Sequence, residues 1–221
     1  MKNKALQKVA LTTISGLSFC GSAQTVSVAV SEDGYINAFG SQLPVVQEGG
    51  TSGNLNVRTP NGSGAFQYNN LSLFGFDTTG VDLTQAASAT VNISFLSGAN
   101  YVGDTLRLYI LADNGGTDSF DETTLTFNSA IADFGIVRGN ALTGQRVPGE
   151  FMEVTAGAVG STLSFNLSAA ALTSLQGSGG NNFVTFVAES RVQDNNPIWQ
   201  LASKEEGALA PASLEITLVP E

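Results

Sequence analysis

Histidine is absent from this chain, and its single cysteine is Cys20, close to the N-terminus. Without histidine, neither a Ser-His-Asp triad nor a Cys-His pair can form, and most zinc sites are excluded. One cysteine cannot make an internal disulfide, so packing has to stabilise the fold. Carboxylate pairs remain as a route to glycoside hydrolysis, but the sequence singles out no such pair. We therefore predict that the protein is not an enzyme.

Basic residues are scarce as well, since 9 Lys and Arg stand against 19 Asp and Glu, for a net charge of -10. Such a chain repels nucleic acid and anionic surfaces. The expected partners are neutral polymers, cations and basic surfaces, although acidity in an exported protein also serves solubility.

Three of the basic residues lie at the start of the chain, where Lys2, Lys4 and Lys8 precede the apolar run Val9–Phe19 and the small residues that end at Ala23. This order is typical of a secretory signal. The run is shorter than the roughly 20 apolar residues of a membrane-spanning helix, and no later segment qualifies. We expect residues 1–23 to be a signal peptide and the protein to be exported to the cell surface or the extracellular space.

Long apolar runs are missing behind this leader, and apolar residues recur mostly at every second position, the period of half-buried strands. Glycine- and asparagine-rich turn clusters separate these stretches. The predicted strands centre on Val26 to Val30, Leu55 and Val57, Leu71 and Leu73, Val91 to Phe95, Leu106 to Ile110, Leu125 and Phe127, Leu163 to Leu167, Phe183 to Val187, and Leu214 to Leu218.

The segment from Ser168 to Gly177 is predicted to be a short helix, with Ser168 as its N-cap and Gly177 as its stop. Many short strands without helical crossovers predict an all-β fold, namely an antiparallel β-sandwich of jelly-roll type. Because no repeat or change of composition divides the chain, residues 24–219 are expected to form a single domain.

An acidic loop reading DNGGTDSFDE offers a candidate calcium site. Asp113, Asp118 and Asp121, with Asn114 and Glu122, are hard oxygen ligands in a glycine-containing loop. Their spacing does not match an EF-hand. The alternative is structural: an acid at this position accepts backbone N–H groups in a turn or pairs with an arginine across the sheet. A structural calcium therefore remains one of two interpretations.

Aromatic rings and amides suggest where a sugar could bind. Trp199, Tyr101 and Tyr35 are candidate rings for stacking on a pyranose, because an aromatic ring desolvates the apolar face of the sugar. Asn196 and Gln200 are candidate hydrogen-bonding partners for the hydroxyls. The alternative for Trp199 is that it plugs the interior at one end of the sandwich.

Several strand-like segments follow one another in a fixed order: DGYI, LNVR, NNLSLFGFD, ATVNISF, LRLYIL, FDETTLTFN, LSFNLS and SKEEGALAPASLEI. In this order they resemble DNRLRE-type domains, also classed as carbohydrate-binding module family 96. Two positions differ, because the family's usual Trp is Phe120 here and its arginine is replaced by Asn69 or Asn70. The resemblance implies a β-sandwich on an exported bacterial protein that binds acidic or neutral polysaccharide without cutting it.

The C-terminal Val-Pro-Glu is similar to the beginning of the Val-Pro-Glu-Pro sorting signal (PEP-CTERM) of exopolysaccharide-associated proteins, with residues 220–221 as its truncated start. This resemblance implies a place at the cell surface or in an extracellular matrix. Two functions are therefore expected: a module that binds polysaccharide, or a structural matrix protein without a glycan pocket that self-associates through exposed strand edges.

Overall fold

The computed structural model describes residues 22–38, 53–58, 69–99, 101–111, 119–125, 129, 150–190 and 198–219. Nearly all of the predicted signal peptide, with Cys20, lies outside these residues. The predicted calcium ligands Asp113 and Asp118 and the predicted sugar contact Asn196 also lie outside them.

The described residues form an antiparallel sheet with a short helix, so the predicted fold class is confirmed. Helix α2 (Ala169–Gly177) lies where the sequence predicted a helix, between Ser168 and Gly177. Two 3-10 turns, η2 and η3, flank parts of the sheet. The strands are β1 (Gln24–Ala29), β2 (Glu32–Ala38), β3 (Asn54–Arg58), β4 (Asn69–Asp77), β5 (Ala86–Ala99), β6 (Thr105–Ile110), β7 (Phe151–Thr155), β8 (Thr162–Asn166), β9 (Phe183–Ser190), β10 (Ile198–Ala202) and β11 (Ser213–Leu218); the helices are α2 (Ala169–Gly177), η2 (Leu83–Gln85) and η3 (Ser178–Gly180).

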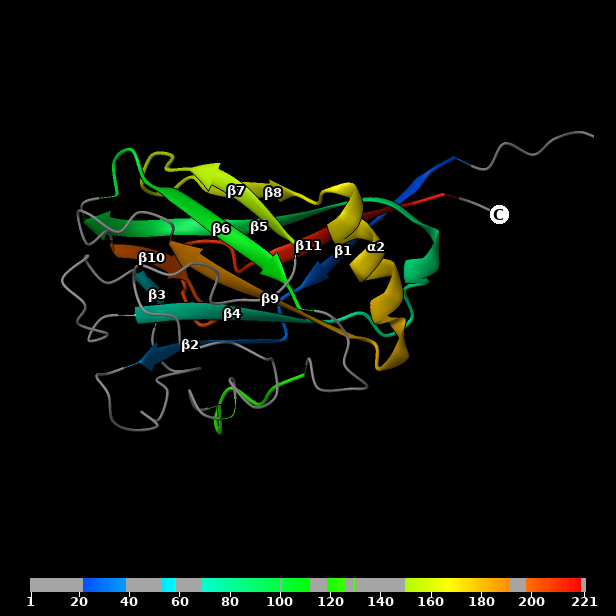
Figure 1. Cartoon of the computed structure of the whole chain (residues 1–221), viewed down its shortest axis with the longest axis horizontal. Coiled ribbons are helices and arrows are strands. Elements are labelled where there is room, and N and C mark those ends of the chain that lie inside the picture. Colours follow the sequence, from blue (N-terminus) through cyan, green and yellow to red (C-terminus); the bar gives the residue numbers. More distant parts are fainter. Residues whose placement is uncertain are drawn as a thin grey trace, which may run out of the picture.

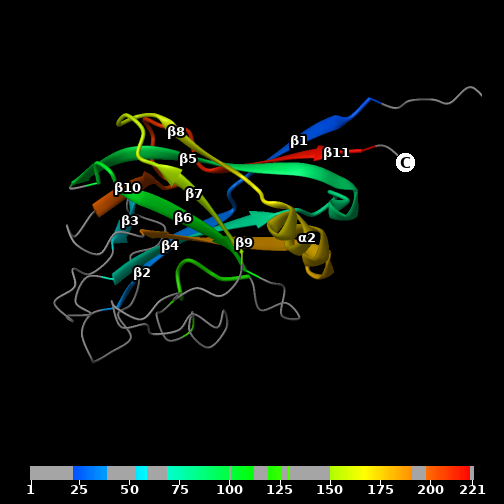
Figure 2. The same cartoon turned by 45° about the horizontal axis from the view of Figure 1, so that its top comes forward.

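The sheet is strongly curled, like half of a barrel, and its strand order is β1-β11-β5-β10-β3-β4-β9-β6-β7. Strand β2 also pairs with β4, and β8 also pairs with β5. The long strand β5 joins the two layers, because its first half pairs with β8 and β11 whereas its second half pairs with β10. Figures 1 and 2 show the resulting two layers, with α2 beside one end of them.

The main hydrophobic core fills the space between these layers. Val91, Ile93 and Phe95 of β5 point into it, as the period of two predicts. Phe74 and Phe76 of β4 face them from the other layer. Helix α2 adds Ala171 and Leu175 to the same core, and Ser168 Oγ accepts the N-capping hydrogen bond from Ala171 N at 3.1 Å. The predicted cap is therefore present.

Strands β4, β6 and β9 are buried on both faces, because a second apolar cluster covers their outer side. Leu71 and Leu73 of β4 pack there with Tyr109 of β6. Ile36 of β2 and Leu125 also belong to this cluster. Leu125 was expected in a strand, but Asp121 to Leu125 form a turn in which Leu125 N donates to Asp121 O at 2.9 Å.

Of the helices that the structure describes, none has the length and apolar content needed to cross a bilayer.

Candidate functional site

The outer face of β8, β5, β11 and β1 consists largely of small polar side chains. In these strands the apolar residues point inward, so every second residue faces solvent. The strand register places these outward residues in rows across the sheet. One row is Asn166, Thr90, Glu215 and Ser27, and the next is Ser164, Asn92 and Ser213. Glu215 is the one charged member of these two rows.

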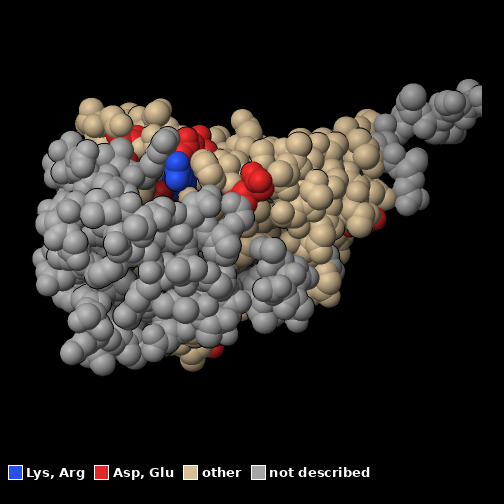
Figure 3. Space-filling model, viewed as in Figure 1, with Lys and Arg blue, Asp and Glu red and all other residues tan. Residues whose placement is uncertain are grey.

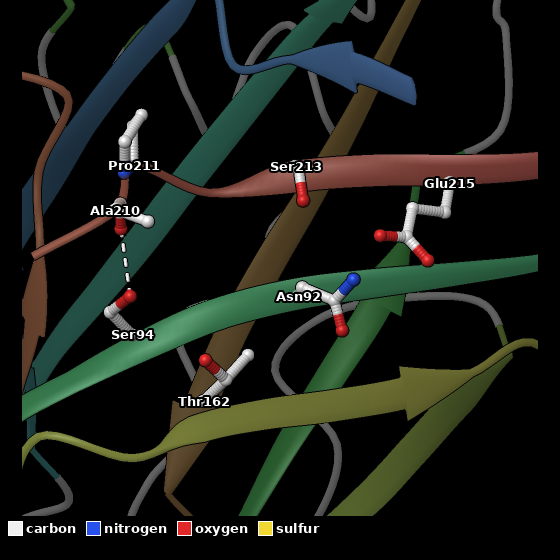
Figure 4. Close-up of a pocket in the computed structure, with 7 residues that line it drawn as sticks. All are labelled: Asn92, Ser94, Thr162, Ala210, Pro211, Ser213 and Glu215. Atoms are coloured by element: carbon white, nitrogen blue, oxygen red, sulfur yellow. Dashed lines mark hydrogen bonds between the residues drawn. The ribbon is translucent and has the colours of Figure 1, made fainter. Parts of the chain in front are cut away.

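A groove of about 440 Å³ lies on this face, and Figure 4 shows its lining. Strand β5 contributes its centre, β8 one side, and β11 with the preceding residues the other side. This volume falls within the roughly 300–1,000 Å³ that is usual for small-molecule sites. The lining residues are Asn92, Ser94, Thr162, Ala210, Pro211, Ser213 and Glu215.

Two hydrogen bonds hold side chains of the groove in place. The Ser94 hydroxyl, on a side chain that is largely buried, donates to the carbonyl oxygen of Ala210 at 2.7 Å, which ties the segment before β11 to β5. Ser164 Oγ donates to Asn92 Oδ1 at 2.7 Å. This bond holds the oxygen of the Asn92 amide toward β8, and Figure 4 shows its nitrogen on the side of β11, toward Ser213 and Glu215.

Four polar side chains of the lining keep hydrogen-bonding capacity. Within the described residues, the Asn92 Nδ2 group, the hydroxyls of Thr162 and Ser213 and the carboxylate of Glu215 have no hydrogen-bonding or ionic partner. The adjacent row differs, because Thr90 Oγ1 donates to Asn166 Oδ1 at 2.9 Å outside the groove. The groove therefore offers one amide donor, two hydroxyls and one acceptor that carries a charge.

Cations are absent from the lining. The described Lys and Arg residues are Arg58, Arg107 and Lys204, and none of them lies on β8, β5, β11 or β1. Charged atoms are also few on the described part of the surface in Figure 3, in keeping with a chain that is 13% charged. The groove is polar but nearly uncharged, with Glu215 as the exception.

The candidate sugar contacts predicted from the sequence lie elsewhere. Trp199 belongs to β10, not to a loop, and its side chain is 0% exposed. Its ring centroid lies 5.3 Å from that of Phe95, and its Nε1 donates to Asp104 Oδ2 at 2.6 Å. The expectation that Trp199 presents its ring at the surface is therefore wrong. The ring fills the interior, as the alternative interpretation proposed.

Among the described residues, the other predicted contacts, Tyr101, Tyr35 and Gln200, are not part of the groove lining. Tyr101 is half-buried and packs edge-on against Phe95, with ring centroids 4.9 Å apart. Tyr35 lies half-buried on β2. Gln200 lies on β10, where its Oε1 accepts a hydrogen bond from Ser97 Oγ of β5. The structure brings Trp199 and Tyr101 together, with centroids 5.9 Å apart, but both rings serve packing.

The acids at the end of the predicted calcium loop make structural contacts. Asp121 Oδ1 accepts from Thr123 N at 2.8 Å and from Thr123 Oγ1 at 2.6 Å, and these bonds lower the pKa of Asp121. Glu122 Oε2 accepts from Lys204 Nζ at 2.5 Å and from Asp33 N at 3.1 Å. These contacts match the structural interpretation, with a lysine in place of the expected arginine. Over the described ranges, no group of three or more His, Cys, Asp or Glu is arranged to hold a metal ion.

Lys204 is the centre of a charged group that we call the Lys204 cluster, made of Glu32, Asp33, Glu122, Lys204 and Glu205. The Lys204 ammonium lies 3.9 Å from a Glu32 oxygen and 3.8 Å from a Glu205 oxygen, besides its bond to Glu122. The Asp33 side chain is 0% exposed, and its Oδ2 accepts from Lys204 N at 2.6 Å. Its Oδ1 has no partner in the described structure. Burial raises the pKa of Asp33 to about 7, while the Lys204 backbone N–H opposes the shift.

No protein-family model matches the chain, and no curated protein matches it either. The resemblance to DNRLRE-type domains therefore stays a prediction.

Proposed function

We propose that this protein is an exported, non-catalytic module that binds polysaccharide at the cell surface or in an extracellular matrix. The groove between β8, β5 and β11 is the proposed binding site. The observation that carries the proposal is the set of unpartnered polar groups on Asn92, Thr162, Ser213 and Glu215. Sugars present hydroxyls that both donate and accept, so a surface with donors and acceptors side by side complements them.

The proposed binding is weak for a single sugar segment. The described lining residues include no aromatic ring, so hydrogen bonds have to supply most of the affinity. A hydrogen bond contributes a net of about 1 kcal/mol, so four of them give about 4 kcal/mol, which corresponds to a Kd of about 1 mM. Copies of the protein displayed together would hold a long polymer more tightly, because each further contact is intramolecular.

A binding role fits the groove better than a hydrolytic one. Glycoside hydrolysis requires two carboxyl groups on opposite sides of the scissile bond. Glu215 is the single acid among the lining residues that the structure describes. The groove therefore contains one half of such a pair.

Affinity electrophoresis of the purified protein through gels that contain different polysaccharides tests the proposal. We expect at least one polysaccharide to retard the protein. Asn92→Ala should abolish most of the retardation, whereas Asn166→Ala should leave it unchanged. The pair is matched, because each asparagine accepts one hydroxyl hydrogen bond across the sheet and only Asn92 lines the groove. The proposal fails if no polysaccharide in a broad panel retards the protein, or if both variants lose retardation equally.

The second candidate is a structural matrix protein that self-associates, and strand β1 favours it. Among the described strands, β1 pairs with β11 alone, and its sequence QTVSVA contains no charge and no proline. Charged residues and proline usually protect an edge strand from pairing with another chain, and β1 has neither. Sedimentation over a range of protein concentrations tests this role. Ser27→Lys places a charge on the edge strand β1, and Thr90→Lys places the same charge on the central strand β5 as the matched control. Monomeric behaviour at every concentration would exclude it.

A further inference from the structure

We infer that the groove selects uncharged sugars that carry two neighbouring hydroxyls, with Glu215 accepting from both hydroxyls and Asn92 Nδ2 donating to the same residue of the glycan. This inference rests on the proposed function and names its ligand class. It also excludes acidic polysaccharides from the groove.

The carboxylate of Glu215 is suited to accept hydrogen bonds from two neighbouring hydroxyls. An ionised carboxylate is an acceptor only, with two oxygens side by side. Two hydroxyls on adjacent carbons match this arrangement, in the way that two N–H groups of an arginine match a carboxylate. Glu215 is exposed, and no described residue pairs with it, so both oxygens are open to a ligand. Hydrogen bonds to a charged acceptor are about twice as strong as neutral ones.

Asn92 supplies the complementary donor. Its Oδ1 is occupied by Ser164, which orients the Nδ2 group toward β11. In the register, Asn92 lies opposite Ser213, and Glu215 is two residues further along β11. Diagonal neighbours of this kind are separated by about 7–8 Å, so a ligand can lie between the two side chains and contact both. A sugar hydroxyl and ring oxygen can accept from Nδ2 while other hydroxyls donate to Glu215.

Charge excludes the acidic alternative. An acidic sugar bound in the same place would bring its carboxylate or sulfate near Glu215, and the described lining residues include no lysine or arginine to compensate. Two like charges about 4 Å apart weaken binding by about fivefold in bulk water and by several hundredfold at the effective dielectric of a protein surface. Binding of one short segment of glycan is already weak, so even a fivefold loss of affinity separates neutral from acidic ligands.

One polysaccharide in two charge states tests the selectivity. The probe is a uronic acid polymer before and after chemical reduction of its carboxyl groups, which keeps the linkage and removes the charge. We expect the wild-type protein to bind the reduced polymer at least about fivefold more tightly. Glu215→Gln should weaken binding of the reduced polymer by about threefold to tenfold and strengthen binding of the acidic one, so that the preference largely disappears.

Two controls separate the possible outcomes. Glu150→Gln removes one charge from an exposed position away from the groove and should leave the preference unchanged. Periodate breaks the carbon–carbon bonds between adjacent hydroxyl-bearing carbons of the reduced polymer, and borohydride converts the resulting aldehydes to alcohols; this treatment should abolish binding. If the wild-type protein prefers the acidic polymer, or if Glu215→Gln behaves like Glu150→Gln, the inference is overturned while polysaccharide binding stands. If neither polymer nor any other polysaccharide binds, the proposed function fails with it.

Discussion

The indole Nε1 of Trp199 and the carboxylate of Asp104 are joined by a hydrogen bond of 2.6 Å in the interior, where the two residues are 0% and 2% exposed. Ser190 Oγ donates to the same Oδ2 at 2.7 Å. A buried carboxylate is stable only when it is well hydrogen-bonded. Asp104 therefore ties β10 and β9 to the turn before β6, and Trp199 is an anchor of the fold.

Replacing Trp199 by phenylalanine should destabilise the protein without changing glycan binding. The variant keeps an aromatic ring but removes the donor to Asp104, and the loss of a buried partner costs about 1–3 kcal/mol. Urea unfolding measures this change, and affinity electrophoresis measures binding. Asp104→Ala should cost more, because it leaves the donors of Trp199 and Ser190 in the interior without their acceptor. Loss of glycan binding at unchanged stability in Trp199→Phe would show that the ring reaches the ligand.

The period of two predicted strand β5, which has one buried face, and it also placed strands at β4, β6 and β9, which are buried on both faces. In β5, Val91, Ile93 and Phe95 alternate with polar residues, and all three lie in the core. Strand β4 is buried on both faces, so its apolar residues Leu73 and Phe74 are adjacent and the period of two is not strict. Trp199 was misplaced because its polar neighbours resemble a loop, although β10 is a short strand between β5 and β3.

The groove could not be identified from the sequence, because its parts are distant along the chain. Ser94 and Ala210 meet only through the pairing of β5 with β11. A strand with alternating serine, threonine and asparagine indicates a solvent-facing side but not which residues meet across it. The register of β8, β5 and β11 supplies that information, and it depends on tertiary folding.

The stability of the protein should fall as the pH rises from about 4 to about 7 because of Asp33. Burial raises the pKa of Asp33 to about 7 in the folded state, from its usual value of 3.8. Between these values the folded state keeps a proton that the unfolded state has lost, so the unfolding free energy decreases with pH. The slope approaches about 1.4 kcal/mol per pH unit for a single such group. Asp33→Asn should remove this slope.

Urea unfolding at several pH values between about 5 and about 8 checks this expectation through the difference between the two proteins. Burial also raises the pKa of Glu32, so Glu32 likewise lowers the stability as the pH rises. Glu32 is present in both the wild type and Asp33→Asn, so its effect does not contribute to the difference. The other charged groups around Asp33 are Glu122, Lys204 and Glu205. They too are present in both proteins, so their contributions to the pH dependence cancel in the comparison. Equal slopes for wild type and Asp33→Asn would contradict the assignment to Asp33.

Alanine at Gly98 should destabilise the protein, whereas alanine at Gly177 should not. A Cβ at Gly98 would lie 2.7 Å from the carbonyl oxygen of Ile198 and 2.7 Å from Tyr101 Cδ1. Ile198 belongs to β10, which pairs with β5 at this point, so relief requires the two strands to move apart. The expected cost in unfolding free energy is about 1–3 kcal/mol.

Gly177 is the matched control for this substitution. A Cβ there meets nothing within 4 Å, and the residue has helical dihedral angles at the end of α2. Alanine should raise the unfolding free energy by up to about 1 kcal/mol, because glycine is the poorer helix former. Equal effects of the two substitutions in urea unfolding would show that the close approach at Gly98 does not limit the packing.

The apparent affinity for a polymer should depend on how many copies of the protein are displayed together. A groove that relies on about four net hydrogen bonds gives millimolar binding of a short oligosaccharide. Copies immobilised at high density contact one long chain at several points, and avidity of this kind reaches about 10²–10⁴. Measuring polymer retention on surfaces of increasing protein density, with Asn92→Ala as the groove variant and Asn166→Ala as its control, checks this dependence. Nanomolar binding of a short oligosaccharide to the isolated protein would contradict the groove as the whole site, because its few open groups cannot supply that affinity even with two hydrogen bonds to the charged Glu215.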